Sequence, residues 1–339
     1  MKASIFFLAY NQASFAAEAI RSAMAQDYPE LELVVCDDAS SDDTRAILEE
    51  ELRHCPAHIT VVRAHSEKNA GLLANFNRCM GACSGEFVVA MAGDDVSLPH
   101  RVSRIATEFA ANPQCMLIYS NWQRIDDDGQ ALPGTCGHRQ DTTFAHGPRP
   151  DCVYAGGKGP GSTAAYRAEI FRTFGPLEIS RRPEDRSSWV RALLLGEIRY
   201  LVEPLVKWRT HASNLSNFLA GLDSAAARKR ILRDLLHRQC YARQFYKDIA
   251  VAEHAALITS DFARRLKFII AHDRERERLR RFALAQVPWK LFIGAARHLM
   301  RISPSPKTLL SILFSEFPTR LSRKRRERRW AKRIHKRRG

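Results

Sequence analysis

Three short polar pairs interrupt the apolar runs of the N-terminal third of the chain. Tyr10-Asn11 follows the first apolar run, Asp37-Asp38 the second, and Asp94-Asp95 a later one. Neighbouring carboxylates that project into a crevice suit a hard divalent cation, which prefers oxygen ligands and leaves room for substrate phosphates. Such a metal would bridge a diphosphate and stabilise charge on a departing nucleoside diphosphate. Helix capping is the alternative, and it fits Asp94-Asp95 poorly because the next helix is expected only after Pro99.

The polar pairs come at the ends of predicted strands. Short apolar runs at 4–9, 31–36, 59–63 and 86–92 alternate with patterns of helical period. This alternation predicts an α/β fold with a mostly parallel central sheet that is covered by helices on both faces. Because ligands of such sheets bind at the carboxyl ends of the strands, we expect the three pairs to share one rim. The pattern continues with a helix at 101–111 and a strand at 115–121.

The glycine motifs of two common nucleotide-binding domains are missing. The first turn, residues 10–14, lacks GxGxxG, which disfavours a dinucleotide-binding Rossmann domain. The glycine-rich stretch 156–162 does not fit GxxxxGK[ST], which argues against a P-loop. Residues 126–129 (DDDG) lack the later ligands of a calcium loop, so we predict a solvated hairpin turn there. Residues 126–162 are predicted to be a long loop region with room for one short strand, and uncovered loops of this length are usually functional.

Charge is distributed unevenly along the 339 residues. The formal net charge is +16, but residues 1–220 hold 22 Lys and Arg against 27 Asp and Glu, whereas residues 221–339 hold 31 against 10. A uniformly basic domain is therefore excluded, and an acidic globular body with a cationic C-terminal third is predicted. Residues 321–339 alone hold eleven Lys and Arg and one Glu.

The cysteines and the apolar runs favour a cytosolic protein. The eight cysteines include no CxxC pair, which favours reduced, mostly buried thiols in a cytosolic protein over a zinc site. We interpret the apolar run after Met1-Lys2 as a buried strand and not as a signal peptide. No run approaches the ~20 apolar residues that a membrane-spanning helix needs.

The cationic third combines amphipathic and polybasic segments. Residues 287–301 mix apolar bulk, Trp289 and scattered cations, and the basic run 323–338 follows. This combination is typical of attachment to an anionic membrane surface. One alternative is a helical lid or dimer contact followed by a disordered tail. Another is nonspecific nucleic-acid binding, for which Trp330 is the one stacking residue of the tail.

Three ordered segments resemble the family 2 glycosyltransferases. They are FFLAYNQASFAAEAIRSAMAQDYPELELVVCDDASSDDT from residue 6, NAGLLANFNRCMGACSGEFVVAMAGDD from residue 69, and RRPEDRSSWVRALLLG from residue 181. The resemblance extends over residues 3–216 and implies the GT-A (nucleotide-diphospho-sugar transferase) fold. We therefore expect a GT-A domain at 1–216, a helical, amphipathic and membrane-associating C-terminal extension at 217–320, and a disordered polybasic tail at 321–339.

The resemblance implies roles for the rim residues. Tyr10 corresponds to an aromatic residue that packs on the uracil of the donor, and Asp38 to the carboxylate that binds the uridine. Asp94 corresponds to the carboxylate on the ribose and diphosphate side, and Asp95 to the direct ligand of Mn²⁺ or Mg²⁺. Many members have DxDD at this strand end, whereas this chain has AGDD, so only the last two carboxylates are present. At the position of the glycine in the family's DDGS turn this chain has Ala39, so the turn need not use a positive φ.

Asp185 of the Glu184-Asp185 pair corresponds to the family's general base. It would deprotonate an acceptor hydroxyl as that oxygen attacks the anomeric carbon from the face opposite the leaving UDP, a single displacement with inversion. From the residues alone, an N-cap or an ion pair with a neighbouring arginine is an equal alternative. The candidate arginines are Arg181, Arg182 and Arg186.

The block KWRTHASNLS at 207–216 also resembles a family segment. It implies that His211 contacts the diphosphate or the metal and that Arg209 offsets phosphate charge. A purely structural closure of the domain, with a capping Ser or Asn, explains the same residues equally well.

The implied activity is transfer of a sugar from a nucleotide-sugar, expected to be a UDP-sugar, to a hydroxyl of a glycan or lipid-linked acceptor in bacterial cell-surface polysaccharide synthesis. We expect such an enzyme in the cytoplasm, peripheral on the cytoplasmic face of the inner membrane, with no specific nucleic-acid partner. One alternative is a nucleotidyltransferase on a similar sheet, although residues 10–14 lack the basic, glycine-rich loop that it needs. The other is a polyanion-binding protein led by the basic tail.

Overall fold

The structure of the chain, a computed structural model, describes residues 1–133, 139–147, 160–178, 184–211, 214 and 242–271. The chain divides into two compact units, one formed by Met1–Ala220 with Arg243–Lys267 and the other by Gly221–Ala242 with Phe268–Gly339. All the labelled helices and strands from β1 to β9 belong to the first unit. Among the described residues, no helix has the length and apolar composition needed to cross a membrane. The five cysteines of this part are free thiols.

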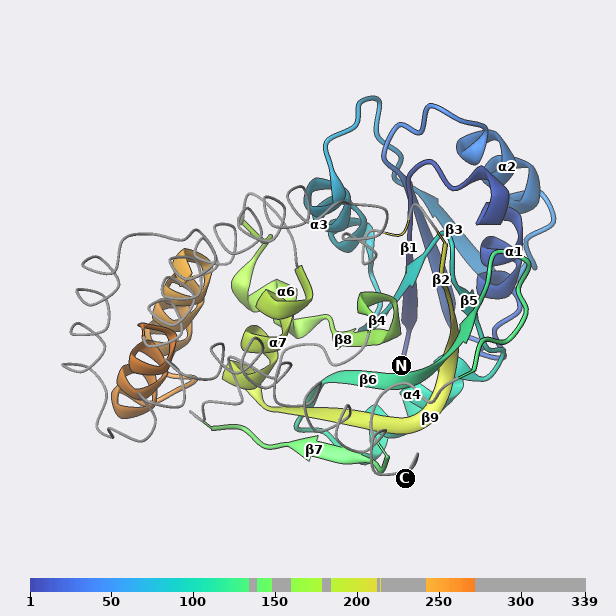
Figure 1. Cartoon of the computed structure of the whole chain (residues 1–339). Coiled ribbons are helices and arrows are strands. Elements are labelled where there is room, and N and C mark those ends of the chain that lie inside the picture. Colours follow the sequence, from blue (N-terminus) through green and yellow to red (C-terminus); the bar gives the residue numbers. More distant parts are fainter. Residues whose placement is uncertain (134–138, 148–159, 179–183, 212–213, 215–241, 272–339) are drawn as a thin grey trace, which may run out of the picture. The chain divides into compact units, whose positions relative to one another are not determined.

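The N-terminal half alternates strands and helices as predicted. Its strands pair in the order β3-β2-β1-β4, and all three pairings are parallel (Figure 1). Phe7 at the centre of the sheet pairs with Val35 on one side and with Met91 on the other. The elements are β1 (Ala3–Ala9), α1 (Ala13–Met24), β2 (Leu31–Asp37), α2 (Thr44–Leu52), β3 (Ile59–Arg63), α3 (Leu72–Ala82) and β4 (Phe87–Ala92).

The second half extends this sheet with mixed pairings. Strand β8 lies antiparallel between β4 and β6, and β9 is parallel to β6 but antiparallel to β5 and β7. The sequence pattern predicted neither β8 nor β9. Both lack regular alternation: β8 is four residues long with three of them buried, and β9 contains Pro204 and pairs with β6 through register shifts. The elements are β5 (Val96–Ser97), α4 (Arg101–Ala111), β6 (Cys115–Ile125), β7 (Thr142–Phe144), the 3-10 helix η1 (Gly161–Thr163), β8 (Ala164–Arg167), α6 (Glu169–Phe174), α7 (Glu184–Leu195) and β9 (Glu197–Arg209).

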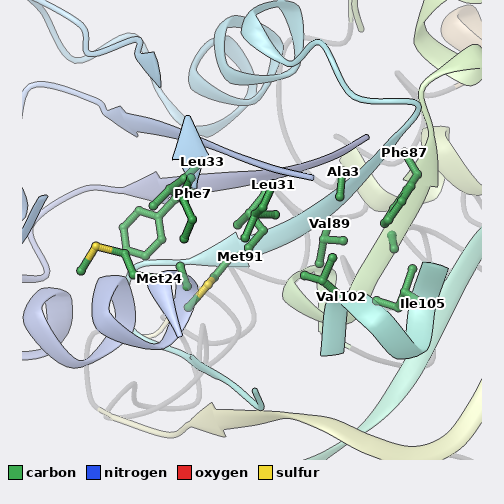
Figure 2. Packing of buried hydrophobic residues seen from close by; sticks show 14 of the residues in the cluster. Ala3, Phe7, Met24, Leu31, Leu33, Phe87, Val89, Met91, Val102 and Ile105 are labelled. Carbon is green, nitrogen blue, oxygen red and sulfur yellow. The ribbon is translucent and has the colours of Figure 1, made fainter. Parts of the chain in front are cut away.

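Apolar side chains cover both faces of the parallel strands. On one face, alternate residues of β1, β2 and β4 pack against α1, α2 and α4, as shown for Phe7, Met24 and Val102 in Figure 2. On the other face, the ring of Phe6 lies 5.2 Å from that of Phe76 in α3, which in turn lies 5.7 Å from the ring of Phe171 in α6. The predicted α/β sheet with helices on both faces is therefore confirmed, and the carboxyl ends of its strands are left to carry the polar pairs.

Two further helical segments, 242–254 and 260–271, follow β9 in the described chain. Residues 243–267 belong to the same compact unit as the sheet. The predicted domain boundary at 216 stays a prediction. Most of the predicted 217–320 region and all of the predicted 321–339 tail lie outside the described residues.

Candidate functional site

The carboxyl ends of β1, β2 and β4 form one rim. The backbone N–H of Asp38 donates to the carbonyl oxygen of Ala9 at 3.0 Å, and that of Gly93 donates to Leu8 at 2.8 Å. These bonds bring the three predicted polar pairs to the same edge of the sheet. Tyr10 at this edge is 44% exposed, which leaves its ring available to a ligand.

The turn after β1 is locked to the turn after β2. The backbone N–H of Asn11 donates to Ser40 Oγ at 2.9 Å, and Asn11 Oδ1 accepts the N–H of Ser41 at 2.8 Å. Ala39 adopts a φ of +56°, so this turn uses a positive φ although it holds alanine in place of glycine. The turn geometry requires the left-handed conformation at that position, and the chain tolerates an alanine there at a steric cost.

Asp38 is buried and bridges the β2 end to the loop before α3. Its Oδ1 accepts the backbone N–H of Ala70 at 3.1 Å, and its Oδ2 accepts that of Gly71 at 2.7 Å. The guanidinium of Arg78 lies 3.7 Å from Oδ1 and is partly exposed. Sequence reasoning missed Arg78, because only the path of α3 brings it back to the rim. Each oxygen of a carboxylate accepts two hydrogen bonds, so Asp38 keeps acceptor capacity for a ligand.

Asp94 is bound by residues that follow β9. His211 Nε2 lies 3.0 Å from Asp94 Oδ2, and Asn214 Nδ2 lies 3.4 Å from the same oxygen. The ring of His211 packs on Phe15 of α1 with 4.7 Å between centroids. The structure therefore brings His211 next to Asp94, as a role at the diphosphate or the metal requires. Asn214 binds the same carboxylate and closes the domain, as the purely structural alternative requires.

Asp95 is buried beside Asp94. Its Oδ1 accepts the backbone N–H of Arg209 at 2.9 Å, and the hydroxyl of Ser162 donates to its carboxylate. Burial raises the pKa of Asp95 well above its usual range, and the charge of Asp94 raises it further. A buried pair of like charges favours either a proton or a cation between its members.

The guanidinium of Arg209 is occupied by hydrogen bonds within the protein. Its Nε donates to the carbonyl of Asp94 at 3.0 Å, its Nη1 donates to the carbonyls of Asp126 at 2.9 Å and Asp127 at 2.8 Å, and its Nη2 pairs with Glu18. The side chain is 1% exposed. The expectation that Arg209 offsets phosphate charge is therefore wrong: four of its five N–H groups serve the 126–129 turn, α1 and the β4 end, and the side chain has almost no exposed surface for a phosphate.

The 126–129 segment is the predicted hairpin turn. The N–H groups of Asp128 and Gln130 donate to Asp126 Oδ1 at 3.1 and 2.8 Å, and Gly129 has a φ of +79°. Asp126 therefore uses its carboxylate inside the turn, and the carbonyls of Asp126 and Asp127 face Arg209.

Arg101 is a second buried arginine that sequence reasoning missed. Its Nη2 donates to the carbonyls of Ala90 at 2.9 Å and Ser162 at 2.6 Å, so it holds η1 against β4. Burial lowers its pKa to about 9, and the charge of Asp95 opposes that shift. Arg101 is the first residue of α4 and follows Leu98-Pro99-His100, and nothing in this local sequence predicts that its side chain is buried and binds backbone carbonyls.

The rim residues fit a divalent cation. Asp94 and Asp95 offer adjacent buried carboxylates, which are the oxygen ligands that Mg²⁺ and Mn²⁺ prefer. In the part of the chain that the structure describes, no group of three or more His, Cys, Asp and Glu side chains is arranged to hold a metal by itself. A cation bound by one or two carboxylates takes its other ligands from water and substrate phosphates, which is the usual coordination of Mg²⁺.

Asp185 lies in the first turn of α7, outside the hydrogen-bonded cluster of Asp94, Asp95, Arg209 and His211. Its Oδ1 is buried and has no hydrogen-bond partner among the described residues. Burial raises its pKa to about 6, against the opposing effects of the Arg186 backbone N–H and charge. A desolvated carboxylate with one free oxygen and a pKa near neutrality has the properties of a general base, whereas the backbone N–H bonds to the carboxylate are what the helix-capping alternative expects. The alternative partners Arg181 and Arg182 lie outside the described residues.

Comparison with known proteins gives one family. A sequence model described as Glycosyl transferase family 2 matches residues 4–174. A protein of Bacillus subtilis (strain 168) described as "Putative glycosyltransferase EpsE" is 27% identical over 237 residues, which are 66% of this chain and 79% of EpsE.

Two solved structures are similar in fold. TarS 1–349 of S. aureus in complex with UDP-GlcNAc aligns with a TM-score of 0.52 at 18% identity and covers 84% of each chain. The mannosyltransferase PcManGT of Pyrobaculum calidifontis in complex with GDP-Man and Mn²⁺ aligns with a TM-score of 0.50 at 15% identity, over 94% of this chain and 80% of PcManGT. At these identities the likeness concerns the fold.

Proposed function

The chain belongs to glycosyltransferase family 2 and has the GT-A fold, and from this premise we propose that it transfers a sugar from a UDP-sugar to a hydroxyl acceptor with inversion at the anomeric carbon. The observation that carries the proposal is the buried Asp94-Asp95 pair at the end of β4, closed by His211. The solved complexes of TarS with UDP-GlcNAc and of PcManGT with GDP-Man support a nucleotide-sugar as the donor.

In this proposal the rim binds the nucleotide. The exposed ring of Tyr10 stacks on the base, and Asp38 accepts a hydrogen bond from the uridine. Asp94 lies on the ribose and diphosphate side. Its orientation is held by His211 and Asn214, since both donate to Oδ2.

Asp95 would hold a divalent metal with the donor diphosphate, and the fit of the two buried carboxylates supports this assignment. When bound, Mn²⁺ or Mg²⁺ supplies positive charge that stabilises the leaving nucleoside diphosphate. The backbone N–H of Arg209 and the hydroxyl of Ser162 orient the Asp95 carboxylate from the protein side.

Asp185 would take the proton of the acceptor hydroxyl. Its unpartnered Oδ1 accepts that proton as the acceptor oxygen bonds to the anomeric carbon and the bond to the nucleoside diphosphate breaks. The acceptor that we propose is a glycan or a lipid-linked glycan in the synthesis of a bacterial cell-surface polysaccharide.

We further propose that the enzyme works in the cytoplasm at the inner membrane and binds anionic lipid through its cationic C-terminal third. Support comes from the 31 Lys and Arg residues of 221–339 against 10 Asp and Glu. Flotation with vesicles of anionic and of neutral lipid tests this, because only the anionic vesicles should retain the chain. Equal retention of a chain that lacks 321–339 would remove the role of the tail.

The activity is tested by calorimetric titration with UDP-, GDP- and dTDP-sugars in the presence of Mn²⁺ or Mg²⁺, followed by a UDP-release assay. Asp95→Asn should lose metal-dependent donor binding, whereas Asp185→Asn should keep donor binding and lose transfer. Asp128→Asn, an exposed residue of the 126–129 turn, is the matched control and should behave as the unaltered chain. Absence of any nucleotide-sugar binding would refute the proposal, and release of pyrophosphate from a nucleoside triphosphate would indicate a nucleotidyltransferase.

A further inference from the structure

The helix that carries Asp185 is anchored by one buried ion pair. Arg191 Nε donates to Asp248 Oδ2 at 3.0 Å, and Arg191 Nη2 donates to Asp248 Oδ1 at 3.1 Å. The two side chains are 0% and 1% exposed. Arg191 belongs to α7, whereas Asp248 belongs to the helical segment 242–254, beyond the residues 4–174 that match the family model.

The same guanidinium holds the connection between α6 and α7. Arg191 Nη1 donates to the carbonyl of Gly175 at 2.6 Å, and Nη2 lies 3.4 Å from that of Phe174 and 3.3 Å from that of Pro176. It also lies over the ring of Phe174, 5.4 Å from its centroid. These three carbonyls begin the connection that leads to Asp185, so one side chain fixes both the start of the connection and the body of α7.

Two amides clamp the connection a few residues further on. Gln244 Oε1 accepts the backbone N–H of Glu178 at 2.7 Å, and Gln244 Nε2 donates to Asp248 Oδ1 at 2.9 Å. Asn77 of α3 makes two bonds to the backbone of Leu177, at 2.8 and 2.9 Å. Residues from α3 and from the segment 242–254 therefore fix the backbone of Leu177 and Glu178, which follow α6.

Stability alone is a poor explanation for this ion pair. Desolvation of two charges offsets most of their attraction, and apolar residues of similar volume often stabilise a protein as well as a buried pair does. A two-pronged arginine–carboxylate contact instead supplies a defined geometry, because both N–H groups and both oxygens must align. An arrangement of this kind is suited to hold a reacting group, since a misplacement of 1 Å costs about 100-fold in rate.

We propose that Arg191, Asp248 and Gln244 are positioning residues that place Asp185 for the transfer reaction, so that the segment 242–254 completes the catalytic helix of the domain. This inference rests on the proposed function, in which Asp185 is the acceptor base. Within the described part of the chain, none of the three residues forms a hydrogen bond or ion pair with Asp94, Asp95, Arg209 or His211, so they act on the acceptor side of the reaction and leave donor binding unchanged.

The test compares Asp248→Asn and Arg191→Lys with the unaltered full chain. Titration with UDP and Mn²⁺ gives the donor affinity and the number of competent sites, and UDP release gives turnover for each competent site. We expect donor affinity within about twofold of the unaltered chain and turnover per site lower by about 10- to 100-fold. The acid limb of the turnover profile should also move to lower pH, because a displaced Asp185 gains water and is left with Arg186 as its charged neighbour.

Lys267→Ala is the matched control, since it removes an ion pair with Glu253 at the surface of the same helical part of the chain. It should leave turnover and its pH profile unchanged. Gln244→Leu is a second variant that keeps both members of the ion pair and removes the bonds of Gln244 to Glu178 and to Asp248 Oδ1, and it should lower turnover by about 3- to 10-fold. It tests the inference even where Asp248→Asn does not fold.

Unchanged turnover per site in Asp248→Asn or in Gln244→Leu overturns the inference. So does a loss of donor-binding sites that accounts for all of the lost turnover, because that result marks a structural role alone. Absence of transfer by the unaltered chain counts instead against the proposed function, and the two failures are thereby distinguished.

Discussion

His211 Nε2 lies 3.0 Å from Asp94 Oδ2, although 117 positions separate the two residues in the chain. The backbone N–H of Arg209 reaches Asp95 Oδ1 at 2.9 Å over a similar separation of 114 positions. Both carboxylates of the candidate metal pair are therefore oriented by the end of β9 and the residues that follow it. The pair is complete only when the C-terminal half of the sheet has formed.

His211→Ala should weaken donor binding. Asp94 loses a buried partner that orients its carboxylate, and loss of such a partner typically costs about 10- to 100-fold in metal affinity. Calorimetric titration with UDP in the presence of Mn²⁺ measures the effect. His58→Ala, at an exposed histidine of the α2–β3 turn, serves as the control and should bind as the unaltered chain does. Equal affinity in the two variants would contradict the role of His211.

Turnover should rise with pH through about 6. Burial raises the pKa of Asp185 to about 6, and only its ionised form accepts the acceptor proton. The acid limb of the kcat profile should therefore lie near that value and be absent from any residual transfer by Asp185→Asn. An acid limb near 4 would show that the base is a solvated carboxylate.

Asp185→Asn should stabilise the fold at neutral pH while it removes activity. The folded pKa of about 6 lies above the ordinary value of 3.8, so the stabilising contribution of the carboxyl is present below 3.8 and is lost as the pH rises through 6. A shift of this size corresponds to about 1–3 kcal/mol at pH 7.5. Urea unfolding at pH 4 and pH 7.5 should show a gain for the variant only at the higher pH. An equal gain at both values would remove the titration as its cause.

Arg209→Lys should lower stability more than it changes the chemistry of the site. Lysine cannot serve Asp94, the 126–129 turn and Glu18 together, and a buried carbonyl that loses its hydrogen bond costs about 1–3 kcal/mol. A fall in Tm and in the free energy of unfolding is expected. Arg53→Lys, at an exposed arginine, should leave both unchanged. Unchanged stability with lost affinity for UDP would show that Arg209 binds phosphate after all.

Ala39→Gly should raise stability. The φ of +56° at Ala39 costs an L-residue about 1–2 kcal/mol, whereas glycine adopts it freely. Part of that gain is offset by the greater entropy of glycine in the unfolded chain, so a net gain of about 0.5–1 kcal/mol is expected. Ala74→Gly within α3 is the control and should cost about 1 kcal/mol. A loss of stability in Ala39→Gly would show that the alanine methyl group packs productively.

Much of the parallel half of the fold follows from local pattern. Buried parallel strands read as continuous apolar runs, and the helices between them show helical period, so β1 to β4 are predictable without any knowledge of their neighbours. The same logic brings Tyr10, Asp38 and Asp94-Asp95 to one rim, because the carboxyl ends of parallel strands lie at one edge of a sheet. The spacing of residues does not predict a catalytic role for Asp185, which was identified only by the resemblance to a family.

Contacts between distant segments required the folded chain. Strand β9 contains a proline and pairs with β6 through register shifts, so its pattern carries no regular alternation. Three features depend on which segments pack together in the folded chain. They are the hydrogen bonds of the Arg209 side chain, the positive φ of Ala39 and the Arg191–Asp248 ion pair. Residue type shows what a side chain can bind. Whether its hydrogen-bonding groups are already satisfied is decided by packing, because a buried donor takes whichever acceptor the fold places beside it.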